Sequence, residues 1–402
     1  MLDERGLTHN ELLLLEQRLL ELKLAESTKA PDIGYVIPVK NPEPSIFAKA
    51  LMSIKNIDPS APIVVVDDGS ESPEIVTTVA KSYGADVLRL AGSHGPGFAR
   101  NLGARHLTNE LLAFIDCDVE LDSSGLHNLA TLFELKKVVA CAPRVLSAKM
   151  KVGNPASNTS FELDMGDSFG IVGPSQLPYL PSAVLLVRRD AFNVVSGFDP
   201  TLLAGEDVDL TNRLSNQGFV IYAPAVRAFH VDPQRHRKSL MKSVKYGLSY
   251  RDLRKLHPDR FSILPSKPKD RAWFILSNLV LGPTLASLLL TLTRATTVVR
   301  TLRRSDRELS TDDIRVILLI SLSQSATELS ELWLRTLLFP LTLLSAKSRR
   351  LRRFLVTMIV VRGVLKPRKP QESLGYRLAS DMGYSLGVVT AILLELANYV
   401  SS

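Results

Sequence analysis

Val64-Val65-Val66-Asp67-Asp68-Gly69-Ser70 is the stretch that decides the fold: a short apolar run that stops at two carboxylates. The stretch Leu112-Ala113-Phe114-Ile115-Asp116-Cys117-Asp118 repeats the arrangement. Uninterrupted apolar runs of this length are typical of strands buried inside a sheet. Carboxylates are costly to place next to a core unless they bind something. The two stretches therefore predict buried strands with a polar site at their ends.

Strand and helix patterns alternate on either side of these two runs. Strands are expected over 33–39, 63–66, 87–90, 111–115, 138–143, 183–188 and 219–223, and helices over 45–55, 72–83, 98–107 and 206–217, with an irregular loop before 178. This alternation predicts an α/β fold with a mostly parallel sheet and helices on both faces. In such sheets ligands bind at the carboxyl ends of the strands.

Charge is distributed unevenly along the 402 residues. Residues 266–402 hold 20 of the 49 Lys and Arg and 10 of the 41 Asp and Glu, so they carry +10 while residues 1–265 carry −2. The stretch 273–293 has no charged residue and is just long enough to cross a bilayer. We expect an amphipathic helix and linker over 1–32, a catalytic domain over 33–265, and an apolar, basic, helical region over 266–402.

The basic, apolar region favours the cytoplasmic face of a membrane, because basic residues beside apolar helices suit an anionic leaflet. A true span and a helical bundle packed on the catalytic domain are both open. Nucleic acid is not an expected partner, since the charges alternate with aliphatic blocks and lack interleaved aromatic residues. Cys117 and Cys141 have no metal-site spacing, and the N-terminus lacks the features of a signal peptide.

Asp116 and Asp118 are the first candidates for chemistry. Two carboxylates one residue apart, just after a strand, can reach a single divalent cation, and hard oxygen ligands suit magnesium or manganese. The alternative is a loop of capping aspartates. His230 follows a later strand and is a candidate third ligand to that cation.

The next candidates lie where a nucleotide would bind. Asp67 and Asp68 could accept hydrogen bonds from a base or a ribose; the alternative is a turn with capping aspartates. The loop 93–101 could meet a diphosphate through its backbone amides and Arg100. The alternative for Arg100 is an ion pair with a strand-end aspartate.

Gly205-Glu206-Asp207-Val208-Asp209 opens a predicted helix, where carboxylates are stabilised as anions. Asp207, with Glu206 beside it, is the candidate general base. Simple capping of the helix dipole is the alternative. Asp209 faces another direction and is expected to be structural.

These motifs, together with Gly197-Phe198-Asp199, resemble in their order glycosyltransferase family 2, the inverting enzymes of the GT-A fold that use sugar nucleotides. The resemblance covers about residues 33–250. It implies a nucleotide-sugar site of Pro38, Asp67, Asp68, Arg100 and Asp116, a manganese or magnesium ion on Asp116, Asp118 and His230, and a base at Asp207 with Glu206.

A narrower resemblance concerns the succession of 179–189, 197–199 and 205–210, which is similar to the glycosyltransferases of the mycofactocin system. That resemblance implies a UDP-sugar donor, glucose above all, and a small-molecule or peptide-derived acceptor hydroxyl. The alternatives are a membrane-associated family 2 enzyme acting on a cell-wall glycan or a lipid-linked acceptor, a nucleotidyltransferase, and an inactive membrane adaptor.

Overall fold

The computed structural model describes residues 32–231 apart from 123–124, 149–162, 168, 173–176, 178 and 203, and helical stretches within 248–257, 338–359 and 381–390. The chain divides into two compact units, Met1–Gln234 and Arg235–Ser402. The expected helix within 1–32, the uncharged stretch 273–293 and the expected boundary near 265 all lie outside the described residues.

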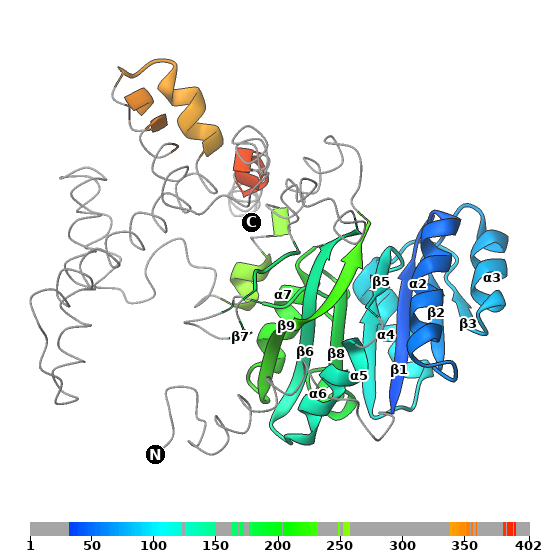
Figure 1. Cartoon of the computed structure of the whole chain (residues 1–402). Coiled ribbons are helices and arrows are strands. Elements are labelled where there is room, and N and C mark those ends of the chain that lie inside the picture. The colour runs from blue at the N-terminus through cyan, green and yellow to red at the C-terminus, as the bar shows by residue number, and fades with distance from the viewer. Residues whose placement is uncertain are drawn as a thin grey trace, which may run out of the picture. The chain divides into compact units, whose positions relative to one another are not determined.

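The first unit alternates strands and helices through its first half (Figure 1). The strands are β1 (Ile33–Val39), β2 (Ile63–Asp67), β3 (Asp86–Arg89), β4 (Leu111–Ile115), β5 (Val119–Leu121), β6 (Val138–Ser147), β7 (Gly170–Ile171), β8 (Val184–Arg188) and β9 (Phe219–His230). The helices are α2 (Pro44–Ile57), α3 (Pro73–Ser82), α4 (Pro96–His106), α5 (Gly125–Ala130), α6 (Arg189–Val194) and α7 (Glu206–Leu214), with a 3-10 turn η1 (Thr131–Glu134).

The strands of the described residues form one nine-stranded sheet in the order β3-β2-β1-β4-β8-β6-β9-β5, with β7 also paired to β9. The strands β3, β2, β1 and β4 are parallel. Beyond them β8 is antiparallel to both β4 and β6, β6 and β9 are parallel, and β5 and β7 are antiparallel to β9. The sheet is therefore mixed, and the expectation of a mostly parallel sheet is wrong for β8, β5 and β7, whose pairings are antiparallel. Parallel neighbours need a crossover connection, usually a helix. The sequence between β6 and β8 contains no helix pattern, which is consistent with their antiparallel pairing.

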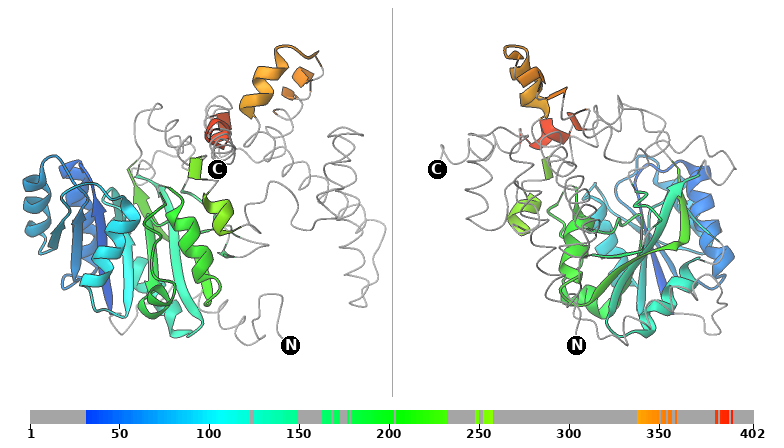
Figure 2. Two further views of the ribbon diagram at one scale, coloured as in Figure 1. Left: turned by 180° about the vertical axis from the view of Figure 1, so that it is seen from behind. Right: turned by 60° about the vertical axis from the view of Figure 1, so that its left-hand side comes forward.

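Helices cover both faces of the sheet, as expected (Figure 2). On one face α2, α3 and α5 pack on alternate residues of the strands, including Tyr35, Val65 and Ala113. On the other face α4, α6 and α7 pack on the intervening residues, including Val36 and Phe114. Because both faces are covered, the strands β2 and β4 are buried at every position, which explains their uninterrupted apolar sequence.

The strand β9 is longer than the sequence predicted, which was 219–223. Its register against β6 shifts where Pro143 faces Ala223 and Arg144 faces Arg227. Pro224 lies in this irregularity and has no N–H to continue a ladder, so the pairing with β6 is interrupted there while the strand itself continues. His230 consequently lies at the end of β9, paired with Val119 of β5, and not in a loop after a strand.

The second unit is described only in short helical stretches, including residues 338–345. Leu338, Leu341 and Leu355 form a small buried cluster. Arg352 donates to the carbonyl oxygens of Ser345 and Ala346, at 3.2 and 3.0 Å, and so satisfies the end of the first stretch. None of the helices in the described stretches combines the length and apolar character that crossing a membrane would require.

Candidate active site

The carboxyl end of β2 carries two buried aspartates with different partners. The Asp67 carboxylate forms an ion pair with Arg89 and accepts from the Ser70 N–H at 2.9 Å. The Asp68 carboxylate accepts from the Ser93 hydroxyl at 2.8 Å and from the backbone amides of His94 and Gly95, at 2.6 and 3.0 Å. Asp68 therefore anchors the glycine-bearing loop that precedes α4.

Pro38 lies beside this point on β1, opposite Val66 of β2. Gly69 allows the backbone after β2 to lie close to the backbone at Gly92. Its φ is +77°, and a Cβ there would lie 2.8 Å from the Gly92 carbonyl carbon. The contacts of Asp67 and Asp68 with a uridine stay predictions.

Arg100 lies on α4 and is almost fully buried. One guanidinium nitrogen donates to the Asp116 carboxylate at 2.7 Å and the other terminal nitrogen to Glu206 at 3.1 Å. The sequence left two roles open for Arg100, and the ion pair with a strand-end aspartate is present. Its contact with a diphosphate stays a prediction.

Asp116 and Asp118 follow β4 and point to different partners. Asp116 is joined to Arg100, whereas an Asp118 carboxylate oxygen lies 3.3 Å from Nε2 of His230. This contact crosses the β5–β9 pairing, which brings the end of β9 next to the loop after β4. Among the residues that the structure describes, no three His, Cys, Asp or Glu side chains are grouped to hold a metal ion. The predicted ligand set of three stays a prediction.

The pair Asp118 and His230 nevertheless fits a divalent cation. The Asp118 side chain is 40% exposed, so a ligand can reach it. Magnesium is usually bound by one or two carboxylates together with water and substrate phosphates, not by a complete protein cage. Carboxylate and imidazole are also ligands that manganese accepts. A cation shared with a bound diphosphate is consistent with these two side chains.

Glu206 and Asp207 begin α7, directly after Gly205, which has a left-handed φ of +80°. The Asp207 carboxylate accepts from the Val208 N–H at 2.8 Å and from the Ser182 N–H at 3.4 Å. Burial raises the pKa of Asp207 to about 7, and the neighbouring Glu206 charge adds to the rise, while Arg100 and the two amides oppose it. A carboxylate with a pKa near neutrality can take up a proton at working pH.

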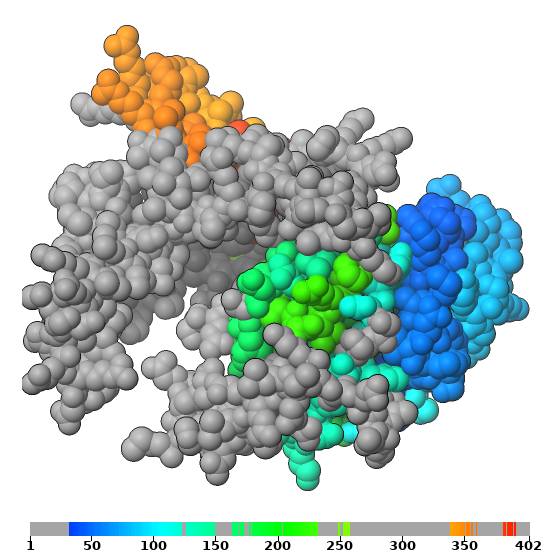
Figure 3. All heavy atoms as spheres, viewed as in Figure 1, coloured from blue at the N-terminus to red at the C-terminus, as the bar shows by residue number. Residues whose placement is uncertain are grey.

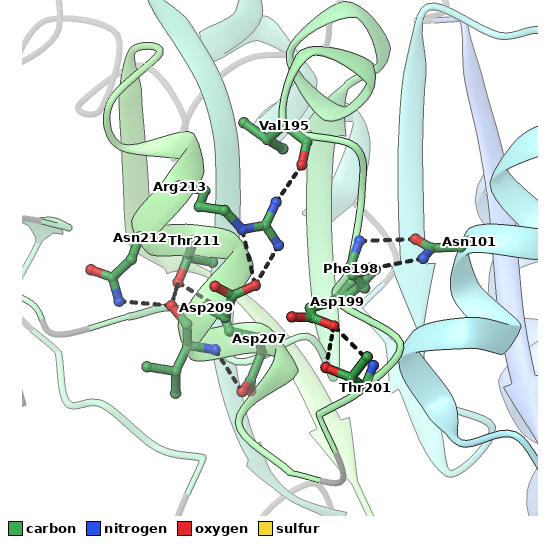
Figure 4. A network of polar contacts seen from close by, with 11 residues as sticks. Asn101, Val195, Phe198, Asp199, Thr201, Asp207, Asp209, Thr211, Asn212 and Arg213 are labelled. Carbon is green, nitrogen blue, oxygen red and sulfur yellow. Dashed lines mark hydrogen bonds and ion pairs between the residues drawn. The ribbon is translucent and has the colours of Figure 1, made fainter. Parts of the chain in front are cut away.

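The Asp209 carboxylate points towards Arg213 and away from the Asp207 carboxylate, as the sequence predicted (Figure 4). Its buried carboxylate forms an ion pair with Arg213 one turn later, and Arg213 also donates to the carbonyl oxygen of Val195. The group ties α7 to the end of α6. Asp209 is therefore structural, in contrast to Asp207 two residues before it.

Asn101 was not singled out from the sequence, yet it fixes the segment that leads into the site. Its side-chain amide donates to the Phe198 carbonyl oxygen at 2.8 Å and accepts from the Phe198 N–H at 2.9 Å (Figure 4). A Cβ at Gly197 would lie 2.5 Å from this amide oxygen. The available signal was the glycine before Phe198, which indicates a tight approach of the backbone.

The arrangement can therefore perform two kinds of chemistry at one edge of the sheet. Asp118 and His230 can bind a cation, and Asp207 can accept a proton. Arg100 binds both Asp116, which lies two residues before Asp118, and Glu206, which directly precedes Asp207. A site with these parts can bind an anionic leaving group and deprotonate a hydroxyl.

The sequence of this chain has recognisable relatives. Residues 35–195 match the family described as Glycosyl transferase family 2. Over 372 residues the chain is 31% identical to the pre-mycofactocin glycosyltransferase of Mycobacterium tuberculosis, with 90% of this chain and 76% of that protein covered. It is 24% identical over 260 residues to N-acetylgalactosaminyltransferase 6 of Drosophila melanogaster, covering 58% of this chain and 39% of that one.

A solved structure is similar to this chain at lower sequence identity. It is a mannosyltransferase from Pyrobaculum calidifontis in complex with GDP-Man and Mn²⁺, with a TM-score of 0.46, 17% sequence identity, and coverage of 78% of this chain and 94% of that one. The family match itself runs from β1 to α6, so it contains Asp67, Asp68, Arg100, Asp116 and Asp118. Glu206, Asp207 and His230 lie beyond it.

Proposed function

The chain belongs to glycosyl transferase family 2 and is a glycosyltransferase, and from this premise we propose that it moves a hexose from a UDP-sugar to an acceptor hydroxyl with inversion at the anomeric carbon. Glucose is the proposed hexose. The observation that carries the mechanism is the place of Asp207 at the start of α7, directly after Glu206, which Arg100 joins to Asp116 after β4. The raised pKa of Asp207, to about 7, fits the role of a base.

The proposed reaction is a single displacement. Asp207 takes the proton of the acceptor hydroxyl while its oxygen bonds to the anomeric carbon, and the bond from that carbon to the diphosphate oxygen breaks. One base and one attack from the face opposite the leaving group require that the configuration inverts. Proton transfer by a positioned carboxylate contributes about 10²- to 10⁴-fold to such a rate.

We also propose that the enzyme uses a divalent cation, manganese or magnesium. Asp118 and His230 would hold it, with Asp116 beside them as the predicted further ligand. When bound, the ion would supply charge neutralisation to the departing diphosphate. Activity should be lost in a chelator and restored by manganese; unchanged turnover in the chelator would remove the metal from the proposal.

The proposed acceptor is the precursor of mycofactocin. The support is the likeness to the pre-mycofactocin glycosyltransferase, which covers 90% of this chain. Purified protein would be given UDP-glucose first and then other UDP-sugars, each with this acceptor and with a simple lipid or glycan acceptor. Transfer is expected to release a nucleoside diphosphate; release of pyrophosphate would indicate a nucleotidyltransferase instead.

The role of Asp207 is tested by Asp207→Asn against a matched control. Transfer should fall by about 10² or more, because the base is lost, while binding of UDP-sugar stays close to the wild-type value. Asp190→Asn makes the same chemical change at an exposed position on α6 and should leave both unchanged. Equal loss of binding and transfer in Asp207→Asn would show that this carboxylate is not the base.

We further propose that the second unit binds the cytoplasmic face of the membrane. Leu343, Leu344 and Val356 are 62%, 56% and 58% exposed. Lys347 and Arg349 are exposed in the same stretch, which is orange in Figure 3. Apolar side chains beside basic ones suit the surface of an anionic bilayer. The apolar side chains are buried at the boundary of the acyl chains, and the basic ones are attracted by the anionic headgroups.

Sedimentation with lipid vesicles tests this location. The full chain should sediment with vesicles that contain phosphatidylglycerol, less with pure phosphatidylcholine, and less at high salt. Leu343→Ser combined with Leu344→Ser should weaken binding, whereas Val194→Ser, which removes a 66% exposed apolar side chain from the first unit, should not. Equal sedimentation with both lipids would contradict the proposal.

A further inference from the structure

Arg100 is a buried cation shared by two carboxylates that lie far apart in the sequence. Only 3% of the residue is exposed. Its two terminal nitrogens donate to Asp116 and Glu206, at 2.7 and 3.1 Å, and its guanidinium lies 5.3 Å from the centre of the Phe198 ring. Because the guanidinium is a rigid plane with donors at fixed angles, two carboxylates bound to it are held at a fixed separation.

The helix that carries Arg100 also has little freedom to shift. One turn before Arg100, a Cβ at Gly97 would lie 3.3 Å from Cβ of Phe198 and 3.7 Å from Cβ of Glu206. The helix α4 therefore packs closely on the segment that begins α7. The guanidinium is fixed by this packing as well as by its own hydrogen bonds.

The two carboxylates belong to opposite sides of the proposed reaction. Asp116 lies in the loop that presents Asp118, the proposed metal ligand on the side of the sugar donor. Glu206 lies next to Asp207, the proposed base on the side of the acceptor. Arg100 contacts both sides directly, through Asp116 and through Glu206.

We propose that Arg100 is a positioning residue, which holds the donor side and the acceptor side of the site at a fixed spacing and balances the Glu206 charge beside the base. This inference rests on the proposed function, because it takes Asp207 as the base. Arg100 then acts on the reaction through Asp116 and Glu206, and contact with the substrate is not required for this role.

The charges around Asp207 give this proposal a measurable signature. Glu206 raises the pKa of Asp207, and Arg100 lowers it. Among the described residues, the backbone amides of Ser182, from the segment before β8, and of Val208, from α7 itself, also donate to the carboxylate. Removing the positive charge and removing the negative charge should therefore move the titration of Asp207 in opposite directions.

The experiment compares three variants across pH. In Arg100→Met the rise of kcat/KM with pH should shift upward by about one pH unit or more, since the opposite charge is gone. In Glu206→Gln it should shift downward by about the same amount. The variant with both substitutions should return close to the wild-type profile but with a lower kcat, because the fixed spacing is lost.

Arg100→Lys separates charge from geometry. A lysine restores the positive charge but has no planar fork, so the pH profile should return towards that of the wild type while kcat stays low. Shifts of Arg100→Met and Glu206→Gln in the same direction, or a loss of kcat with no shift in either, would overturn the proposal. If Arg100→Met does not fold, Arg100→Lys decides, because a wild-type kcat in Arg100→Lys would overturn the positioning role.

A second readout does not depend on turnover. The midpoint of unfolding in urea, compared across pH between each variant and the wild type, reports a change in the titration of Asp207 even if the enzyme transfers no sugar. If the pH dependence of the urea midpoint shifts in opposite directions in Arg100→Met and Glu206→Gln, this would support the role of Arg100 whatever the reaction is. Absence of sugar transfer by the wild type would refute the proposed function alone.

Discussion

Replacing Asp207 with asparagine should change the stability of the protein as well as its turnover. Asp207 has a pKa of about 7 in the folded protein against 3.8 for an ordinary aspartate, because burial and the Glu206 charge disfavour its ionised form. The folded protein therefore keeps this proton at pH values where the unfolded chain has lost it. Between the two pKa values the free energy of unfolding falls as pH rises.

The size of the effect follows from the difference between the two pKa values. About three pH units correspond to about 4 kcal/mol of stability, which is fully present below the ordinary pKa and lost as pH rises through 7. About 3 kcal/mol of this loss falls between pH 5 and pH 8. In Asp207→Asn the side chain has nearly the same shape, keeps an oxygen for the Val208 N–H, and carries no charge.

When the pH is raised from 5 to 8, the free energy of unfolding of the variant should therefore rise relative to that of the wild type by about 3 kcal/mol. This is equivalent to about 6–12 °C in Tm for a domain of this size. Urea unfolding followed by circular dichroism at both pH values measures it. For Asp190→Asn, at an exposed position, the difference in the free energy of unfolding from the wild type should be the same at both pH values. A constant difference for Asp207→Asn too would refute the raised pKa, and with it the argument for Asp207 as the base.

Three further outcomes are expected. Asp118→Asn should raise the manganese concentration for half-maximal activity by about tenfold or more, measured by titrating metal into chelated enzyme; an unchanged value would remove Asp118 from the site. Asp209→Asn should lower the free energy of unfolding by about 3 kcal/mol, because it removes the negative charge that is paired with Arg213, and urea denaturation checks it. Asn101→Ala should cost about 2 kcal/mol through two lost hydrogen bonds to Phe198, with a larger loss of kcat than of donor binding.

Much of the fold was predictable because burial leaves a local pattern in the sequence. The strands 33–39 and 111–115 were expected with the bounds that β1 and β4 have, since both are short runs without a charged residue. The short elements β5, α5, β7 and α6 were missed, because they contain two to six residues, too few to show a period. The direction of β8 was also missed, since an apolar run carries no information on whether its neighbours are parallel.

For the candidate site, the residue types were predictable and their partners were not. Acidic residues after buried strands indicated where a polar site would form, and the helix that begins at Glu206 indicated a second group of carboxylates. The sequence did not show that Asp68 binds the loop before α4 or that His230 reaches Asp118 across β5 and β9. Each of these contacts depends on strand order and register.

The sequence by itself determined that this chain has a buried α/β sheet edged with carboxylates, because apolar runs and the residues that end them are local features. Only the tertiary structure decided which carboxylates share Arg100 and which one has its pKa raised. Asp116 and Glu206 meet one guanidinium because strand order brings distant segments to one edge of the sheet. The pKa of Asp207 depends on the burial and the charges that this folding creates around it.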